Sequence, residues 1–175
     1  MAALRPVDFR RILAQTYPWV KSPFIVGAPM RVMAGPGLAV AMSSAGGLGF
    51  IGPQAKAGDV FLDLETAAAL IPPASTLRRA NPALLPVGIG FQTWNGDLQV
   101  ATSAVQEHRP CAAWLFAPRR GQRELNEWTA RLRQASPDTQ VWIQVGTLRE
   151  AVEAARSPTP PDVLVVQGAE AGGHG

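Results

Sequence analysis

The chain has 175 residues, of which 47% are hydrophobic and 17% are charged. This composition supports one sizeable core and excludes a disordered or fibrous chain. The net charge of +3 does not indicate a nucleic-acid-binding protein, because the basic residues are scattered over helix-like segments and loops. We expect solvated faces at Arg78 and Arg79, Arg119 and Arg120, and Arg131 and Arg133.

Cysteine content and targeting signals indicate a cytoplasmic protein. The lone cysteine, Cys111, opens an apolar run at residues 111–116, so we expect it to pack as a small buried hydrophobe in a reducing compartment. Residues 1–11 lack the apolar core of a signal peptide, and Pro6 and Asp8 argue against a clean amphipathic helix there. Apolar runs fall short of the roughly 20 residues that a bilayer requires, so no membrane span is expected.

The first half of the chain alternates between apolar strand-like runs and helical periodicity. The predicted elements are a strand at 24–30, a helix at 38–45, a strand at 48–51 and a helix at 59–70. Pro29 ends the first strand because proline cannot donate a ladder hydrogen bond. Asp59 is the expected cap of the second helix, whose apolar residues recur at spacings typical of one helical face.

The second half continues the same alternation after a polar segment, 74–82, to which we assign no element. The predicted strands are 85–91, 112–116, 140–145 and 163–167, and the predicted helices are 98–108, 124–134 and 148–155. Asp97 is the expected cap of the first of these helices. Thr147 and Glu150 match a capping box, in which each satisfies a backbone donor near the other.

Strands that alternate with helices predict an α/β fold with a parallel sheet. Two architectures fit: an open doubly wound sheet, or a (β/α)8 TIM barrel, which usually needs about 250 residues. The chain stops in a glycine-rich turn after the sixth strand, with no crossover helix behind it. We therefore favour a single domain over residues 1–175 that is an incomplete barrel of about six strands, truncated after the sixth.

In either architecture a ligand lies at the carboxyl ends of the strands. Small residues and neutral amides recur at these ends, which suits a large flat ligand. The two histidines, His108 and His174, are far apart in sequence, so no metal site is expected. The sequence contains neither a nucleophile elbow nor a phosphate-binding loop. It therefore does not indicate a hydrolase or a nucleotide-binding enzyme.

In this chain, residues 163–175 form the stretch that most strongly indicates a functional site. An apolar strand breaks into a glycine-rich turn that carries Gln167, Glu170 and His174. Glycines on both sides of His174 allow its imidazole to approach a ligand and take up a proton. The alternatives are a solvated histidine near the chain end and, for Glu170, a turn carboxylate held by backbone donors.

These residues resemble a known family. Residues 167–175 closely match the motif Q-G-x-E-A-G-G-H-x-G of nitronate monooxygenases, also called 2-nitropropane dioxygenases, which are FMN-dependent flavoprotein (β/α)8 barrels. Residues 24–30 and 38–52 resemble the first strand, first helix and second strand of that family. The resemblance covers about the first two thirds of a family member.

The resemblance implies an oxidoreductase that converts nitronates or nitroalkanes, with dioxygen, into carbonyl compounds and nitrite. FMN would carry the redox chemistry, and His174 would be the catalytic base. Flavin contacts are implied for Pro29, Met30, Gln167 and Gly172, and Gln144, at the end of the fifth strand, is a further candidate.

Two departures from the family pattern leave alternatives open. Gly90 stands where many members carry an asparagine that binds the flavin, and the loops after the seventh and eighth strands, which hold the FMN phosphate, are not in this chain. An exposed apolar flank would favour association with another chain, including a second copy. The alternatives are a non-catalytic half-barrel or interaction module without flavin, and an FMN enzyme similar to enoyl reductases.

Overall fold

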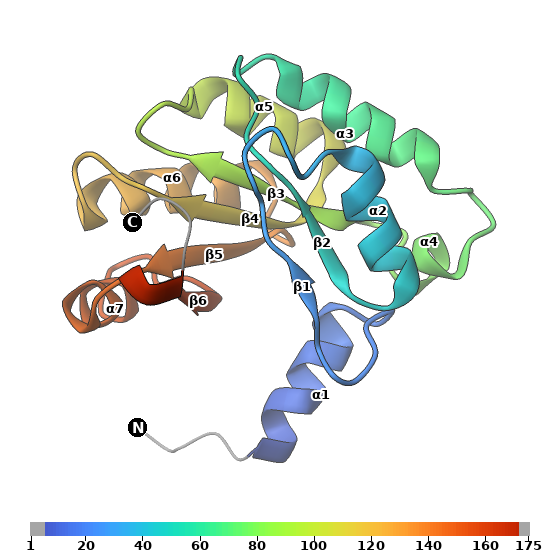
Figure 1. The fold of residues 1–175 in the computed structure, drawn as a ribbon, viewed down its shortest axis with the longest axis horizontal. Helices are drawn as coiled ribbons and strands as arrows, with labels where there is room; N and C mark the ends of the chain where they lie inside the picture. Colours follow the sequence, from blue (N-terminus) through green and yellow to red (C-terminus); the bar gives the residue numbers. More distant parts are fainter. Residues whose placement is uncertain (1–5, 172–175) are drawn as a thin grey trace.

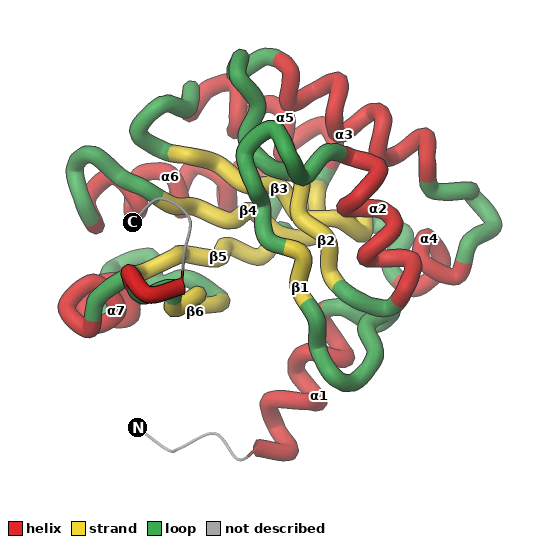
Figure 2. The backbone as a smooth tube through the Cα atoms, in the orientation of Figure 1, coloured by secondary structure: helices red, strands yellow, loops and turns green. Residues whose placement is uncertain are grey.

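The computed structural model describes residues 6–171. Six parallel strands form one curled sheet in the order β1-β2-β3-β4-β5-β6, with helices along its outer face (Figures 1 and 2). The strands are β1 Val26–Gly27, β2 Leu48–Ile51, β3 Leu85–Gln92, β4 Pro110–Phe116, β5 Gln140–Val145 and β6 Val163–Val166. The sheet is therefore the expected half-barrel, because sequence order and spatial order agree throughout and no strand reverses the winding.

The helices follow the strands in alternation. They are α1 Pro6–Thr16, α2 Pro36–Ala45, α3 Asp59–Leu70, α4 Thr76–Ala80, α5 Leu98–His108, α6 Gln122–Ala135, α7 Leu148–Ala155 and the short 3-10 helix η1 Ala169–Ala171. Asp97 caps α5 as predicted, since its carboxylate accepts hydrogen bonds from two backbone N–H groups. None of the helices in residues 6–171 combines the length and apolar character needed to cross a bilayer.

Three sequence-based predictions of local structure were wrong. Helix α1 forms although Pro6 and Asp8 argued against it, because proline is favoured in the first helical turn, where its missing N–H removes no bond. Asp59 begins α3 but Gly58 occupies the cap position, with no side-chain hydrogen bond. Strand β1 keeps only two paired residues of the expected seven, 24–30, because the chain turns away from β2 after Gly27.

The two faces of the sheet carry different cores. Residues that point outward from the central strands pack against α2, α3, α5 and α6, and form the larger apolar cluster. Residues that point into the half-barrel form a second cluster, rich in aromatic side chains, which includes Phe50, Trp114 and Trp142. Strand side chains alternate between the faces, so each central strand is buried on both sides.

The aromatic cluster fills the interior of the half-barrel. The Phe50 ring lies 5.1 Å from those of Trp114 and Trp142, between ring centroids, in edge-on and tilted arrangements. Tyr17, the first residue after α1, accepts a 2.9 Å hydrogen bond from Trp142 Nε1. Burial raises the pKa of the Tyr17 hydroxyl far above its ordinary value, so this residue stays a neutral part of the packed interior.

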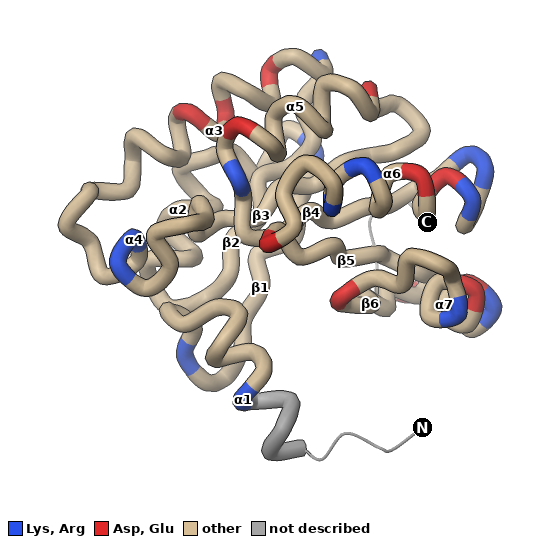
Figure 3. Tube along the Cα trace, turned by 180° about the vertical axis from the view of Figure 1, so that it is seen from behind, with Lys and Arg blue, Asp and Glu red and all other residues tan. Residues whose placement is uncertain are grey.

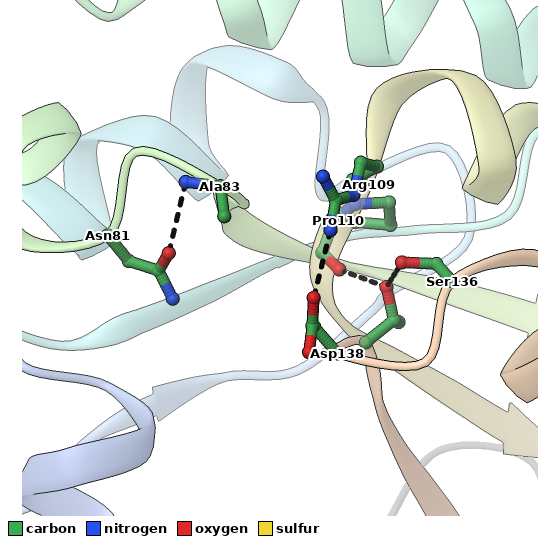
Figure 4. A network of polar contacts seen from close by, with 7 residues as sticks. Asn81, Ala83, Arg109, Pro110, Ser136 and Asp138 are labelled. Carbon is green, nitrogen blue, oxygen red and sulfur yellow. Dashed lines mark hydrogen bonds and ion pairs between the residues drawn. The ribbon is translucent and has the colours of Figure 1, made fainter.

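A polar network ties together the loops at the amino ends of the strands (Figure 4). Arg109 and Asp138 form an ion pair at 2.9 Å, and the Thr139 hydroxyl donates to the carbonyl of Pro110 at 2.7 Å. A second bond, from Ala83 N–H to the Asn81 side chain, orders the entry to β3. This end of a barrel serves stability, which leaves the opposite, carboxyl edge for a ligand.

Charged residues are dispersed over the outer helices and loops, with basic and acidic positions interspersed (Figure 3). Several of the arginines expected on solvated faces are partnered. Arg120 pairs with Glu127 at 3.0 Å, Arg133 pairs with Asp162 at 3.1 Å, and Arg78 donates to the Ala68 carbonyl. Cys111 is buried as predicted, and burial raises the pKa of its thiol.

Candidate active site

The carboxyl edge of the sheet is built on close packing between the loop after β1 and strand β3. Pro29 is buried, and a Cβ added at Gly90 would overlap its ring. The carbonyl of Met30 packs against Gly52 in the same way, so the ends of β1, β2 and β3 hold one another at backbone distance. Met30 itself is 50% exposed and follows Pro29 directly, which leaves an apolar side chain available at this edge.

On β5, the side chain of Gln144 is held in place by a hydrogen bond from the neighbouring strand β4. Its Oε1 accepts a hydrogen bond from Trp114 Nε1 at 3.1 Å, across the β4–β5 pair. Because the carbonyl end of the amide is occupied, the NH2 end is left to donate, and no described residue accepts from it. Gln144 therefore offers a fixed donor on the inner face of the half-barrel.

Gln167 extends the same edge to the last strand. Its backbone N–H donates to the carbonyl of Val145 at 3.0 Å, which continues the β5–β6 pairing one residue past Val166. Gln144 pairs in register with Val165, so both amide residues belong to the carboxyl ends of neighbouring strands. Gly172 and His174, the other two residues predicted for the site, lie outside the described residues.

The loop after β5 is held by the predicted capping box. The Glu150 carboxylate accepts from the backbone N–H groups of Gly146 at 2.8 Å and Thr147 at 3.0 Å, while the Thr147 hydroxyl accepts from Glu150 N–H at 3.2 Å. The bond from Gly146 is the largest cause that holds the pKa of Glu150 below its ordinary value. This carboxylate therefore stays ionised and fixes the loop that follows Gln144.

No family-wide sequence profile matches the chain. It is 67% identical over all of its 175 residues to the nitronate monooxygenase npaC of Metarhizium robertsii, and 34% identical over 90% of its length to a nitronate monooxygenase of Neurospora crassa. The chain belongs to the nitronate monooxygenase family. It spans 49% of the first relative and 46% of the second, so it corresponds to about half of a family member and not to the predicted two thirds.

The carboxyl edge fits the ring system that nitronate monooxygenases are expected to bind. A flat heteroaromatic ligand needs apolar support and polar groups at its rim. Met30 supplies exposed apolar surface, Gln144 supplies a donor, and the buried Oε1 of Gln92 is an acceptor without a hydrogen-bond partner among the described residues. An FMN ring carries both donors and acceptors at its rim, so these residues suit it.

Three features of this carboxyl edge were not predicted from the sequence. Trp114 was grouped with an apolar run, Gln92 received no role, and Gly90 was noted only as a departure from the family asparagine. Alternation along β3 and β4 places Gly90, Gln92 and Trp114 on one face of the sheet, the face that Gln144 occupies on β5. The two-residue alternation along each strand could have predicted which face these residues share. It does not reveal which residues meet across strands.

A cavity of about 50 Å³ lies beside the same edge, among the loop after β2, the end of β3, and helices α3 and α5, and its lining includes Gly90 and Gln92. Asp63 lines it, and burial raises the pKa of this carboxyl, opposed by a hydrogen bond from Gln54. This volume is far below the roughly 300–1,000 Å³ of ligand pockets, so the cavity does not accommodate a flavin ring. The candidate site for a flat ligand is therefore the inner carboxyl edge.

Proposed function

We propose that the protein containing this chain is an FMN-dependent nitronate monooxygenase, which oxidises nitronates and nitroalkanes with dioxygen to carbonyl compounds and nitrite. The observation that carries the proposal is the Gln144 donor, fixed by Trp114 at the carboxyl edge of a chain 67% identical to a protein named for this activity. The chain spans about half of that relative, so the proposal concerns the whole protein.

Each residue at the edge has a proposed role toward the flavin ring. Pro29 and Met30 support the ring from the loop after β1, while Gln144 donates to its rim. Gln167 and Gly172 contact it from the loop after β6. When bound, FMN supplies the electron transfer that links oxidation of the substrate to dioxygen, and the protein supplies placement and a proton acceptor. The six strands described do not include the phosphate-binding loops that follow strands 7 and 8 of a barrel.

His174 is the proposed base that takes the proton from the carbon next to the nitro group of a nitroalkane. The strand-end residues Met30, Gln144 and Gln167 are neutral, so they orient a ligand but do not accept this proton. An imidazole titrates near neutral pH, which suits a general base. Glu170, on η1, is exposed and is the competing candidate.

Flavin binding is tested by titrating the purified chain with FMN and, in parallel, with riboflavin, which lacks the phosphate. We expect the visible absorbance of the flavin to shift on binding, for both ligands, because the described residues meet only the ring. If neither spectrum changes, this chain is a half-barrel without flavin, and the assignment of Pro29, Met30 and Gln144 fails.

The base is tested by comparing His174→Ala with Glu170→Gln, in oxygen-uptake assays with a nitroalkane and with its preformed nitronate. General-base catalysis contributes about 10²–10⁴-fold, so we expect His174→Ala to lower the nitroalkane rate by about 10²-fold or more. The nitronate rate should fall much less, because a nitronate has already lost that proton. Equal losses in the two variants, or an unchanged nitroalkane rate in His174→Ala, would remove the assignment.

A further inference from the structure

Helices α3 and α5 lie side by side on the outer face of the half-barrel (Figure 1). Three side chains from these two helices that could ligate a metal ion lie close together. Glu65 comes from α3, and Glu107 and His108 come from the last turn of α5. One ligand atom of each residue lies within 4.8 Å of those of the other two. This cluster is distinct from the carboxyl edge that we assign to the flavin.

His108 is the anchor of the cluster. Its side chain is only 12% exposed, and its Nε2 is buried without a hydrogen-bond partner among residues 6–171. That nitrogen lies 3.8 Å from Oε1 of Glu107, which is beyond hydrogen-bonding distance. The Phe61 ring, one helical turn before Glu65 on α3, packs edge-on against the imidazole and restricts its rotation.

The charges of the cluster are unbalanced. Glu65 and Glu107 place two carboxylates near each other, and within the described part of the chain no lysine or arginine forms an ion pair with either. Like charges at this separation repel, and a buried nitrogen without a partner is unfavourable. One cation bound among the three side chains would offset the repulsion between the carboxylates and would give the buried nitrogen a partner.

The donor set selects the class of cation. One imidazole nitrogen and two carboxylate oxygens suit first-row divalent metals such as Zn²⁺, whereas Mg²⁺ prefers oxygen ligands and keeps its water. Ligand atoms on one tetrahedral Zn²⁺ lie about 3.4 Å apart, given bonds of roughly 2.0–2.2 Å. Both glutamates are exposed, so rotation of their side chains closes the remaining distance.

We propose that Glu65, Glu107 and His108 form a Zn²⁺ site that clasps α3 to α5, with water as the fourth ligand. The site joins two helices that flank the sheet, so bound metal should stabilise the fold by mass action. This proposal does not depend on the proposed enzyme activity.

The test uses the chain carrying His174→Ala, which leaves His108 as its only histidine. ZnCl2 is titrated and followed by calorimetry and by the imidazole proton signals of His108 in NMR. We expect binding of one Zn²⁺, a shift of the His108 signals, and no response to MgCl2 at the same concentrations. His108 signals that stay in place at saturating Zn²⁺, or an equal response to Mg²⁺, would overturn the site.

Glu65→Gln is the decisive variant, because Glu65 is exposed and its replacement should leave the fold intact. We expect Zn²⁺ affinity to fall at least about tenfold, since one of three protein ligands is lost. Glu153→Gln, on α7, is the matched control, because Glu153 is likewise exposed and its carboxylate pairs with Arg149. Equal Zn²⁺ affinity in the two variants would contradict the proposal, and His108→Gln gives an independent check on the imidazole.

Discussion

Strands β4 and β6 have similar apolar sequences but different surroundings. Strand β4 lies between β3 and β5, and all of its residues except Phe116 are buried. Strand β6 has a strand neighbour on one side only among the described residues, and Val166 is 78% exposed. An apolar run therefore predicts a strand, whereas the burial of that strand depends on partners on both of its edges and both of its faces.

We expect the largest loss of stability from a substitution at the centre of the sheet and a much smaller loss from one at its edge. Trp142→Ala removes ring packing against Phe50 and Trp114, and leaves the Tyr17 hydroxyl without its donor, so we expect a loss of about 3–5 kcal/mol in the free energy of unfolding. Val166→Ala should change it by less than about 0.5 kcal/mol. Urea denaturation measures both, and comparable losses would show that β6 is buried in solution.

Alanine substitutions at two glycines test the packing at the carboxyl edge of the sheet. Gly90→Ala forces a methyl group into the Pro29 ring, so we expect a destabilisation of about 1–3 kcal/mol. Displacement of Pro29 should also weaken FMN binding at least tenfold. Gly37→Ala, on α2, is the control, because an added Cβ there meets nothing within 4 Å. Flavin titrations that do not distinguish the two variants would contradict the role of the Pro29–Gly90 contact.

The smallest expected effect concerns the capping box that begins α7, beside β6. Glu150→Gln weakens the bonds to the Gly146 and Thr147 N–H groups, and should cost about 0.5–2 kcal/mol at pH 7. Hydrogen bonds from these groups, above all Gly146, lower the pKa of Glu150 below 4.5. A lowered folded-state pKa gives stability that is present above pH 4.5 and is lost as the pH falls through the folded value.

The measurement compares the unfolding free energy of the wild-type chain and Glu150→Gln across this range. The difference should be largest at neutral pH and should shrink as the solution is acidified below pH 4.5. Amide exchange in α7 should rise in the variant, while exchange in the central strands stays unchanged. A difference that is constant with pH would mean that the charge of Glu150 does not contribute.

Local signals in the sequence predicted the elements well. Strands β2 and β5 begin and end at the predicted residues, and Asp97 and Thr147 cap the helices expected of them. Helix α1 was missed because Pro6 was weighed as a helix breaker and not as a first-turn residue. The assignments of Gly172 and His174 rest on the family motif, and both residues lie outside the part of the chain that the structure describes.

The sequence by itself determined the alternation of strands and helices, the caps at Asp97 and Thr147, and the family. These features depend on residues that are close in sequence, because helix caps and hydrophobic periodicity involve positions only a few residues apart. Only the tertiary structure decided that Trp114 orients Gln144, that Gly90 packs on Pro29, and that Glu65 meets His108. The physical reason is that strand register and helix packing set these contacts, and both depend on residues far apart in the chain.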